Sequence, residues 1–183
     1  MVIYRLPRGE SFFLDRSYCP SCEKKLAWYD LFPIFSFILL LGKCRYCHAR
    51  ISFRYPLIEL LTGVIFLLLF WHFGPTAVFL KYLFLSALLV AVSFIDLEHY
   101  IVPNSLVITG LVGGIILNIA ARDVGVLSAL IGLLVTSGFL LIVALVSKGG
   151  MGGGDVKLAA VTGFFLGWPL GPFGLFMGAC AGG

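Results

Sequence analysis

The fourth apolar run of this chain ends in Lys148-Gly-Gly-Met-Gly-Gly-Gly-Asp-Val-Lys-Leu-Ala-Ala160, and another apolar stretch follows at once. Five glycines within six residues lead to a single acid, Asp155. An ionisable residue beside a membrane span is a candidate functional residue, because a charge is costly there. Aspartate is also a favoured N-cap residue, so Asp155 is equally compatible with a cap on a helix that starts at Val156. This stretch by itself leaves both interpretations open.

The composition identifies an integral membrane protein. Of the 183 residues, 60% are hydrophobic and 12% are charged, whereas soluble domains are about 45–50% apolar and about 25% charged. Four apolar runs are long enough to cross a bilayer as helices. They cover residues 57–73, 76–96, 104–121 and 124–147. We therefore expect an all-α polytopic membrane protein with a helical bundle.

A polar module precedes the first span, which divides the chain into predicted domains 1–56 and 57–183. Nine of the 13 Lys and Arg residues lie in the first 54 positions, and such a cluster predicts a cytoplasmic location by the positive-inside rule. Topology accounts for these charges, so we predict no nucleic-acid partner. The apolar stretch 31–41 is too short to span, which predicts a helix on the membrane surface or packed on the bundle.

The number of crossings places two acids at one membrane face. With the module inside, the second span returns to the cytoplasmic side and ends at Asp96. The fourth span returns to the same side and is followed by Asp155. Arg122 and Asp123 lie between the third and fourth spans and face outward.

Asp96 lies at a helix C-terminus, where the helix dipole opposes an anion, so capping does not explain it. Two carboxylates about 3 Å apart cannot both ionise easily and share a proton. One then acts as a base toward water while the other polarises a peptide carbonyl. The pattern is compatible with aspartic proteolysis at the membrane boundary. It is also compatible with an interfacial Asp96 and a capping Asp155 that never meet.

Four cysteines form two Cys-x2-Cys pairs, Cys19 with Cys22 and Cys44 with Cys47. In a reducing compartment this spacing is typical of a closed structural Zn2+ site. A redox-active pair is the alternative interpretation.

The ordered set of motifs resembles the type IV prepilin peptidase family, within the G-x-G-D intramembrane aspartyl proteases. The signature itself is Gly152-Gly153-Gly154-Asp155, with Gly163 and the Asp96 segment ending in Val102-Pro-Asn104. The module adds further matching elements. These are Val2-Ile-Tyr-Arg-Leu-Pro-Arg8, Tyr18-Cys-Pro-Ser-Cys22, Trp28-Tyr29, Pro33, Gly42-Lys-Cys-Arg-Tyr-Cys47, Ile51-Ser52, Arg54-Tyr-Pro56 and Glu59.

The resemblance implies an aspartic endopeptidase in the bacterial cytoplasmic (inner) membrane that removes the leader from prepilins or pseudopilins. Asp96 and Asp155 would be catalytic, the three glycines would let the substrate approach, and the zinc-binding module would face the cytoplasm. The family resemblance also implies N-methylation of the new N-terminus with S-adenosylmethionine, which no residue pattern here indicates independently. Family members begin with an earlier membrane helix and continue through a later one, so we expect a chain truncated at both ends relative to them.

Two other functions fit parts of this pattern. An aspartyl protease for preflagellins or signal-peptide remnants is disfavoured by the cysteine tetrad. A membrane assembly or transport protein would use the two acids as a proton or ion relay and the zinc module as a docking site.

Overall fold

The computed structural model describes residues 18–19, 21–31, 35–147 and 152–182, and these are helical with two isolated β-bridges. Within this part of the chain no extended sheet forms, which confirms the all-α prediction. The matching motifs at 2–8 and Pro33, and the start of the glycine stretch at 148–151, lie outside the described residues. The helices are η2 (Trp28–Leu31), α2 (Phe35–Leu39), α3 (Arg54–Phe73), α4 (Ala77–His99), α5 (Asn104–Ala121), α6 (Val126–Val146), α7 (Gly153–Leu166) and α8 (Leu170–Gly182).

Four of these helices, α3 to α6, are long and apolar enough to cross a membrane. They match the four predicted spans to within three residues at each end, and a polytopic membrane protein is confirmed. The difference at Asp96 matters for the site, because α4 continues to His99 before the left-handed Tyr100 ends it. α7 also begins earlier than expected, at Gly153, so the last two glycines of the stretch are helical.

The chain folds as two compact units, Met1–Leu68 and Leu69–Gly183. The first, unit 1, carries the cysteine knuckles, α2 and most of α3. The second, unit 2, carries α4 to α8. The domain boundary predicted at 56/57 remains a prediction.

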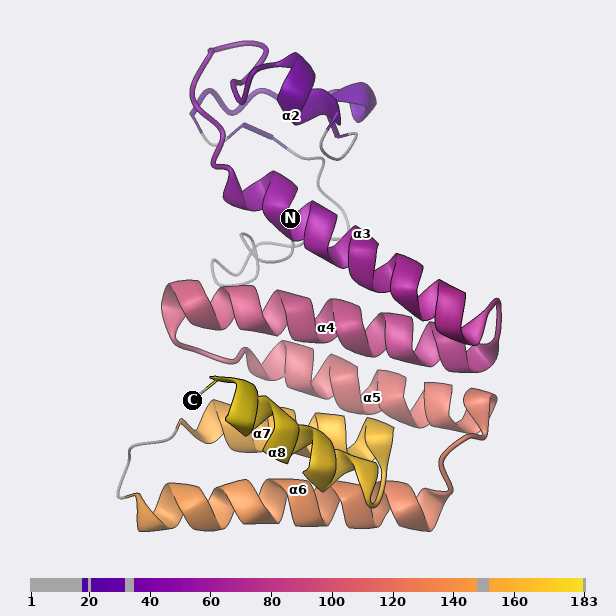
Figure 1. Cartoon of the computed structure of the whole chain (residues 1–183). Coiled ribbons are helices and arrows are strands. Elements are labelled where there is room, and N and C mark those ends of the chain that lie inside the picture. Colours follow the sequence, from indigo (N-terminus) through magenta and orange to yellow (C-terminus); the bar gives the residue numbers. More distant parts are fainter. Residues whose placement is uncertain (1–17, 20, 32–34, 148–151, 183) are drawn as a thin grey trace. The chain divides into compact units, whose positions relative to one another are not determined.

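Within unit 2, α7 is the helix around which the others pack. It contacts α5, α6 and α8, while α4 packs against α5 (Figure 1). The buried core joins Leu85, Val107, Val161 and Phe165, which come from α4, α5 and α7. The sequence of α7 fits this central place because it alternates small residues with Val161 and Phe165, both fully buried.

Close helix approach depends on particular glycines. A Cβ on Gly132 of α6 would collide with the backbone oxygen of Gly163 in α7, and one on Gly110 would lie 2.9 Å from a methyl of Val161. Gly113 and Gly114 of α5 are packed in the same way, because aromatic rings occupy the space that a Cβ would need. Not every glycine in the spans is packed in this way: a Cβ added to Gly63 or Gly138 would meet nothing within 4 Å.

Candidate active site and metal centre

Asp96 lies in the last turn of α4 and is half-buried. Its carbonyl oxygen accepts a hydrogen bond of 2.8 Å from the N–H of Tyr100, whose left-handed conformation (φ 54°) closes the helix. The carboxylate therefore lies within the helix near its negative end rather than after it. The helix dipole still opposes an anion there, so packing of the helix end gives no reason for an acid at this position.

Asp155 is the third residue of α7 and is also half-buried. The N-cap is Gly152, which has no side chain to cap with, so the interpretation of Asp155 as the N-cap is wrong. The reason is that the helix starts two residues before Asp155 and the acid falls in the first turn. There the free N–H groups and the dipole favour a carboxylate.

The segments that carry the two acids are held together at one end of unit 2. The ammonium of Lys157 in α7 donates a hydrogen bond of 2.8 Å to the Oδ1 of Asn104, the first residue of α5. The first turn of α7 also packs on the α4–α5 loop, where Val102 lies against Gly154. Figure 1 shows the end of α4, the start of α5 and the start of α7 on the same side of the unit. The number of membrane crossings in the sequence predicts that these segments lie at the same face.

The three glycines of the signature have different surroundings. Gly152 and Gly153 are exposed, and a Cβ on Gly153 would meet nothing within 4 Å. A Cβ on Gly154 would lie 2.7 Å from the Cγ2 of Val102. The structure therefore gives Gly154 a packing role and leaves the space beside Gly153 open. A Cβ on Gly152 would lie 3.7 Å from the Oδ2 of Asp155.

The four module cysteines converge on one point. Their Sγ atoms all lie within 4.8 Å of one another, and Cys19 and Cys47 are 3.8 Å apart. This separation excludes a disulfide, whose S–S bond is about 2.05 Å, and the cysteines are free. Four sulfurs about 2.3 Å from a tetrahedral Zn2+ would be separated by about 3.8 Å. The tetrad therefore fits zinc in both donor type and spacing.

Both Cys-x2-Cys pairs have the same backbone turn. The residue after the second cysteine donates its N–H to the carbonyl of the first, from Glu23 to Cys19 at 2.8 Å and from His48 to Cys44 at 3.0 Å. Glu23 and His48 both have a positive φ, of 55° and 56°. Each turn directs its two thiols toward one common centre. The Cys-x2-Cys spacing predicts this convergence, and the two turns show how the backbone achieves it.

The thiols influence one another strongly. Burial raises the pKa of Cys19, but hydrogen bonds from the N–H groups of Ser21 and Cys22 and from neighbouring thiols lower it to about 7. The N–H of Ala49 lowers the pKa of Cys47, yet loss of solvent and the neighbouring cysteines raise it to about 11. One thiolate thus forms readily while another resists ionisation. A divalent cation at the centre would remove this conflict by stabilising all four thiolates.

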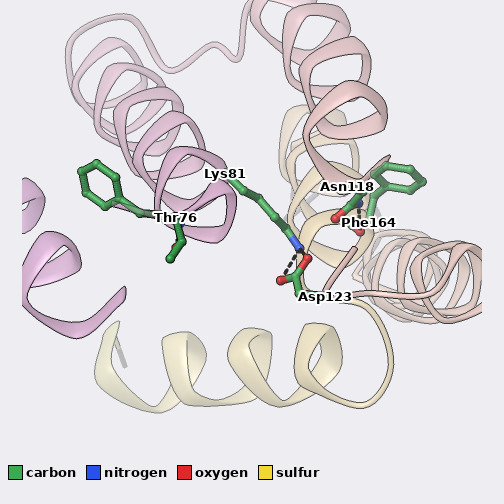
Figure 2. A network of polar contacts seen from close by, with 6 residues as sticks. Thr76, Lys81, Asn118, Asp123 and Phe164 are labelled. Carbon is green, nitrogen blue, oxygen red and sulfur yellow. Dashed lines mark hydrogen bonds and ion pairs between the residues drawn. The ribbon is translucent and has the colours of Figure 1, made fainter. Parts of the chain in front are cut away.

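An ion pair that the sequence does not predict lies at the other end of unit 2. Lys81, in the second turn of α4, is fully buried, and its ammonium lies 2.9 Å from both carboxylate oxygens of Asp123 (Figure 2). The sequence places Asp123 in an outward loop and gives no sign that Lys81 is its partner. The number of membrane crossings also places these two residues at one face, but it does not show that they touch.

A second buried polar contact lies near this ion pair. The side-chain amide of Asn118 in α5 donates a hydrogen bond of 3.1 Å to the carbonyl oxygen of Phe164 in α7 (Figure 2). The Asn118 side chain is buried, and this bond satisfies its amide nitrogen, which would otherwise be costly in an apolar bundle. Its Oδ1 has no hydrogen-bond partner among the described residues. The hydrogen bond links the central helix to α5 at the end away from the two acids.

Two family models and several curated proteins match this chain, and all of them are described as peptidases of one kind. Residues 1–73 match the family model described as the bacterial peptidase A24 N-terminal domain, and residues 83–183 match that of the type IV leader peptidase family. The prepilin leader peptidase/N-methyltransferase of Myxococcus xanthus is 39% identical over 175 residues, covering 92% of this chain and 52% of that protein. The proteins of the same name from Neisseria gonorrhoeae and Klebsiella pneumoniae are 37% and 34% identical. These alignments cover 91% and 92% of this chain and 60% and 78% of the relatives.

The chain thus spans between about half and about four-fifths of the length of these three relatives. No solved structure matches it.

Proposed function

Since the chain belongs to the type IV leader peptidase family, we propose that it is an aspartic endopeptidase that removes the leader from type IV prepilins or pseudopilins. The observation that carries the proposal is the contact between the two acid-bearing segments. Gly154 packs on Val102, and Lys157 donates a hydrogen bond to Asn104. The turn that carries Asp155 therefore contacts the loop that follows Asp96. The cleavage site would lie at the cytoplasmic face of a bacterial inner membrane.

The two acids would divide the proton transfers. We assign the base to Asp155, because the partial positive charge of the first turn of α7 stabilises a carboxylate. We assign the acid to Asp96, because the end of α4 carries the opposite partial charge. Asp155 takes a proton from a water whose oxygen attacks the scissile carbonyl carbon, while Asp96 donates its proton to the carbonyl oxygen. As the C–N bond breaks, Asp155 gives its proton to the departing amide nitrogen. Asp96 takes back a proton from a hydroxyl of the tetrahedral intermediate as the new carboxyl group forms, so both acids return to their starting states.

The zinc-binding module would hold the cytoplasmic side of the enzyme together. The cysteines Cys19, Cys22, Cys44 and Cys47 would bind the ion and supply all four ligands. A site closed by four protein ligands leaves no position for a water or a substrate. Its contribution is therefore to the fold of unit 1 and to the start of α3, rather than to the cleavage.

The names of the relatives also motivate a second activity, N-methylation of the residue that cleavage exposes, with S-adenosylmethionine as the methyl donor. In the described residues no strand leads into a glycine-rich turn and helix, the arrangement that commonly cradles nucleotide cofactors. No catalytic step is assigned to this cofactor.

Co-expression of the full-length protein with a prepilin tests the peptidase. Asp96→Asn and Asp155→Asn should each abolish the shortened product on a gel, because general acid–base catalysis contributes about 10²–10⁴-fold. Glu98→Gln is a matched control, since it removes an exposed acid two residues from Asp96. Membrane insertion of each variant is checked by fractionation.

Continued processing by either inserted Asp→Asn variant would rule out the catalytic pair. It would then favour a relay of protons or ions between the two acids.

A further inference from the structure

Unit 1 exposes a group of large apolar side chains beside its zinc knuckles. Ile38, Leu39, Leu41 and Phe53 are 63%, 82%, 83% and 68% exposed, and we call this set the apolar tip. Side chains of this size are seldom left this open together in water. The tip is therefore a candidate contact surface.

The tip is one continuous local structure, although its members come from two segments. The rings of Phe37 and Phe53 pack edge-to-face with centroids 6.0 Å apart. The N–H of Gly42 donates to the carbonyl oxygen of Phe37 at 2.9 Å, and the N–H of Ile51 donates to the carbonyl oxygen of Gly42 at 2.7 Å. The end of α2 is thus fixed against the segment that leads into α3.

Cationic residues flank the apolar tip. Lys43 and Arg50 face each other across an antiparallel bridge, and Arg54 is the first residue of α3. All three are exposed. Residues 31–58 contain no acid. Asp30, which precedes them, lies against Arg45 at 2.8 Å with its side chain 2% exposed, and Glu59 follows them in α3. The edge of the tip therefore presents positive charge.

Leu41 of the apolar tip has a backbone conformation that is unfavourable for leucine. The N–H of Leu41 donates to the carbonyl oxygen of Ile38, and the N–H of Gly42 donates to that of Phe37. These two hydrogen bonds form a Schellman motif that ends α2. Leu41 occupies the left-handed position of that motif, with a φ of 50°. Glycine is the usual residue there, because a side chain in this conformation is strained. A leucine that is both strained and exposed is disfavoured by the turn itself, so its presence needs another partner.

The connection to α3 places the tip at the membrane surface. α3 starts at Arg54, directly after Phe53, and its 20 residues are about 30 Å long, which matches the hydrocarbon thickness of a bilayer. Its first residues must therefore lie near the headgroups. Because Phe53 contacts Phe37, the end of α2 is held at the same level.

We propose that the apolar tip inserts among the lipid headgroups and upper acyl chains, with Lys43 and Arg50 against the phosphates of anionic phospholipids. The partner is the bilayer itself, so α2 and the zinc knuckles are anchored at the membrane surface in addition to their covalent link to α3. Apolar side chains ringed by Lys and Arg are the pattern that binds anionic interfaces. This anchoring is independent of the chemistry of Asp96 and Asp155.

Photo-crosslinking tests the partner directly. The full-length protein carrying p-benzoylphenylalanine in place of Leu39 is reconstituted in nanodiscs of phosphatidylcholine with phosphatidylglycerol, or of phosphatidylcholine alone. Mass spectrometry should find phospholipid adducts, with a higher yield in the anionic discs. The same probe in place of Tyr46, an exposed aromatic on the second knuckle, should give few adducts. A crosslink to another part of the chain or to a second copy, instead of lipid, would overturn the proposal.

Charge and shape variants provide matched controls. Lys43→Gln with Arg50→Gln should lower the ratio of docked to undocked module about 30-fold in anionic discs, since each cation near such a surface contributes about 1 kcal/mol. Lys24→Gln with Lys25→Gln removes the same charge from the first knuckle and should leave the yield unchanged. Leu41→Gly should relieve strain and still lose lipid adducts at position 39. Equal yields for both charge pairs, or adducts undiminished by Leu41→Gly, would contradict the assigned surface.

Discussion

Lys81 and Asp123 form an ion pair whose two members differ in their access to solvent. The Lys81 side chain is fully buried, whereas that of Asp123 is 22% exposed. Removing one partner of a buried pair leaves the other charge uncompensated, and the cost depends on how well water reaches that charge. The two single substitutions should therefore have unequal effects.

We expect Asp123→Asn to destabilise the protein by about 3–5 kcal/mol, because it leaves the Lys81 ammonium buried without a counter-charge. Lys81→Met should cost less, since it leaves an acid that water still reaches and adds a side chain suited to the apolar bundle. Thermal unfolding in detergent micelles measures the order of the variants. The double variant should unfold at a higher temperature than Asp123→Asn alone, and an equal loss from both single variants would contradict this account.

At the scale of helices, the α6–α7 interface depends on the absence of side chains. Gly132 and Gly163 approach so closely that a Cβ on Gly132 would also lie 2.7 Å from the carbonyl carbon of Gly167. Backbone atoms cannot move aside as a flexible side chain does, so a methyl group here separates the helices. Small residues of this kind let membrane helices pack by van der Waals contact.

Gly132→Ala and Gly138→Ala test this interface within one helix. Gly132→Ala should destabilise by about 1–3 kcal/mol through overpacking. Gly138→Ala, with nothing within 4 Å, should be neutral or stabilising by up to about 1 kcal/mol, because alanine loses less entropy in a helix. Unfolding of the two variants in the same detergent compares them. Equal effects would mean that the close approach of α6 and α7 does not contribute to stability.

At the scale of the whole molecule, the two compact units should respond differently to metal removal. The protein purified under reducing conditions should contain about one zinc per chain. A chelator should increase proteolysis of the knuckle segment while the segment from α4 to α8 stays protected, since the zinc site lies entirely in unit 1. Limited proteolysis followed by mass spectrometry measures both.

Cysteine variants provide the control for the metal experiment. Cys44→Ser should lower the zinc content, whereas Cys180→Ser should not, because Cys180 lies in α8 outside the tetrad. Zinc retained by Cys44→Ser at the wild-type level would contradict four-cysteine ligation.

The amino-acid sequence alone predicted the helical class, the four spans and the four clustered cysteines. Each follows from a local or additive property, namely a run of apolar residues or a fixed Cys-x2-Cys spacing. It also predicted that Asp96 and Asp155 reach one face, because each crossing reverses the direction of the chain.

Features that depend on contact between distant residues emerged only in the tertiary structure. The sequence could not tell the packed Gly132 from the open Gly138, since both lie in one apolar helix and differ only in what faces them. It did not show that Val102 lies where a side chain on Gly154 would be, or that α7 begins at Gly153. The burial of Lys81 against Asp123 likewise depends on how α4 meets the α5–α6 turn. The local pattern of apolar residues determines which helices form. The contacts between helices determine which glycines are packed and which charged side chains are paired.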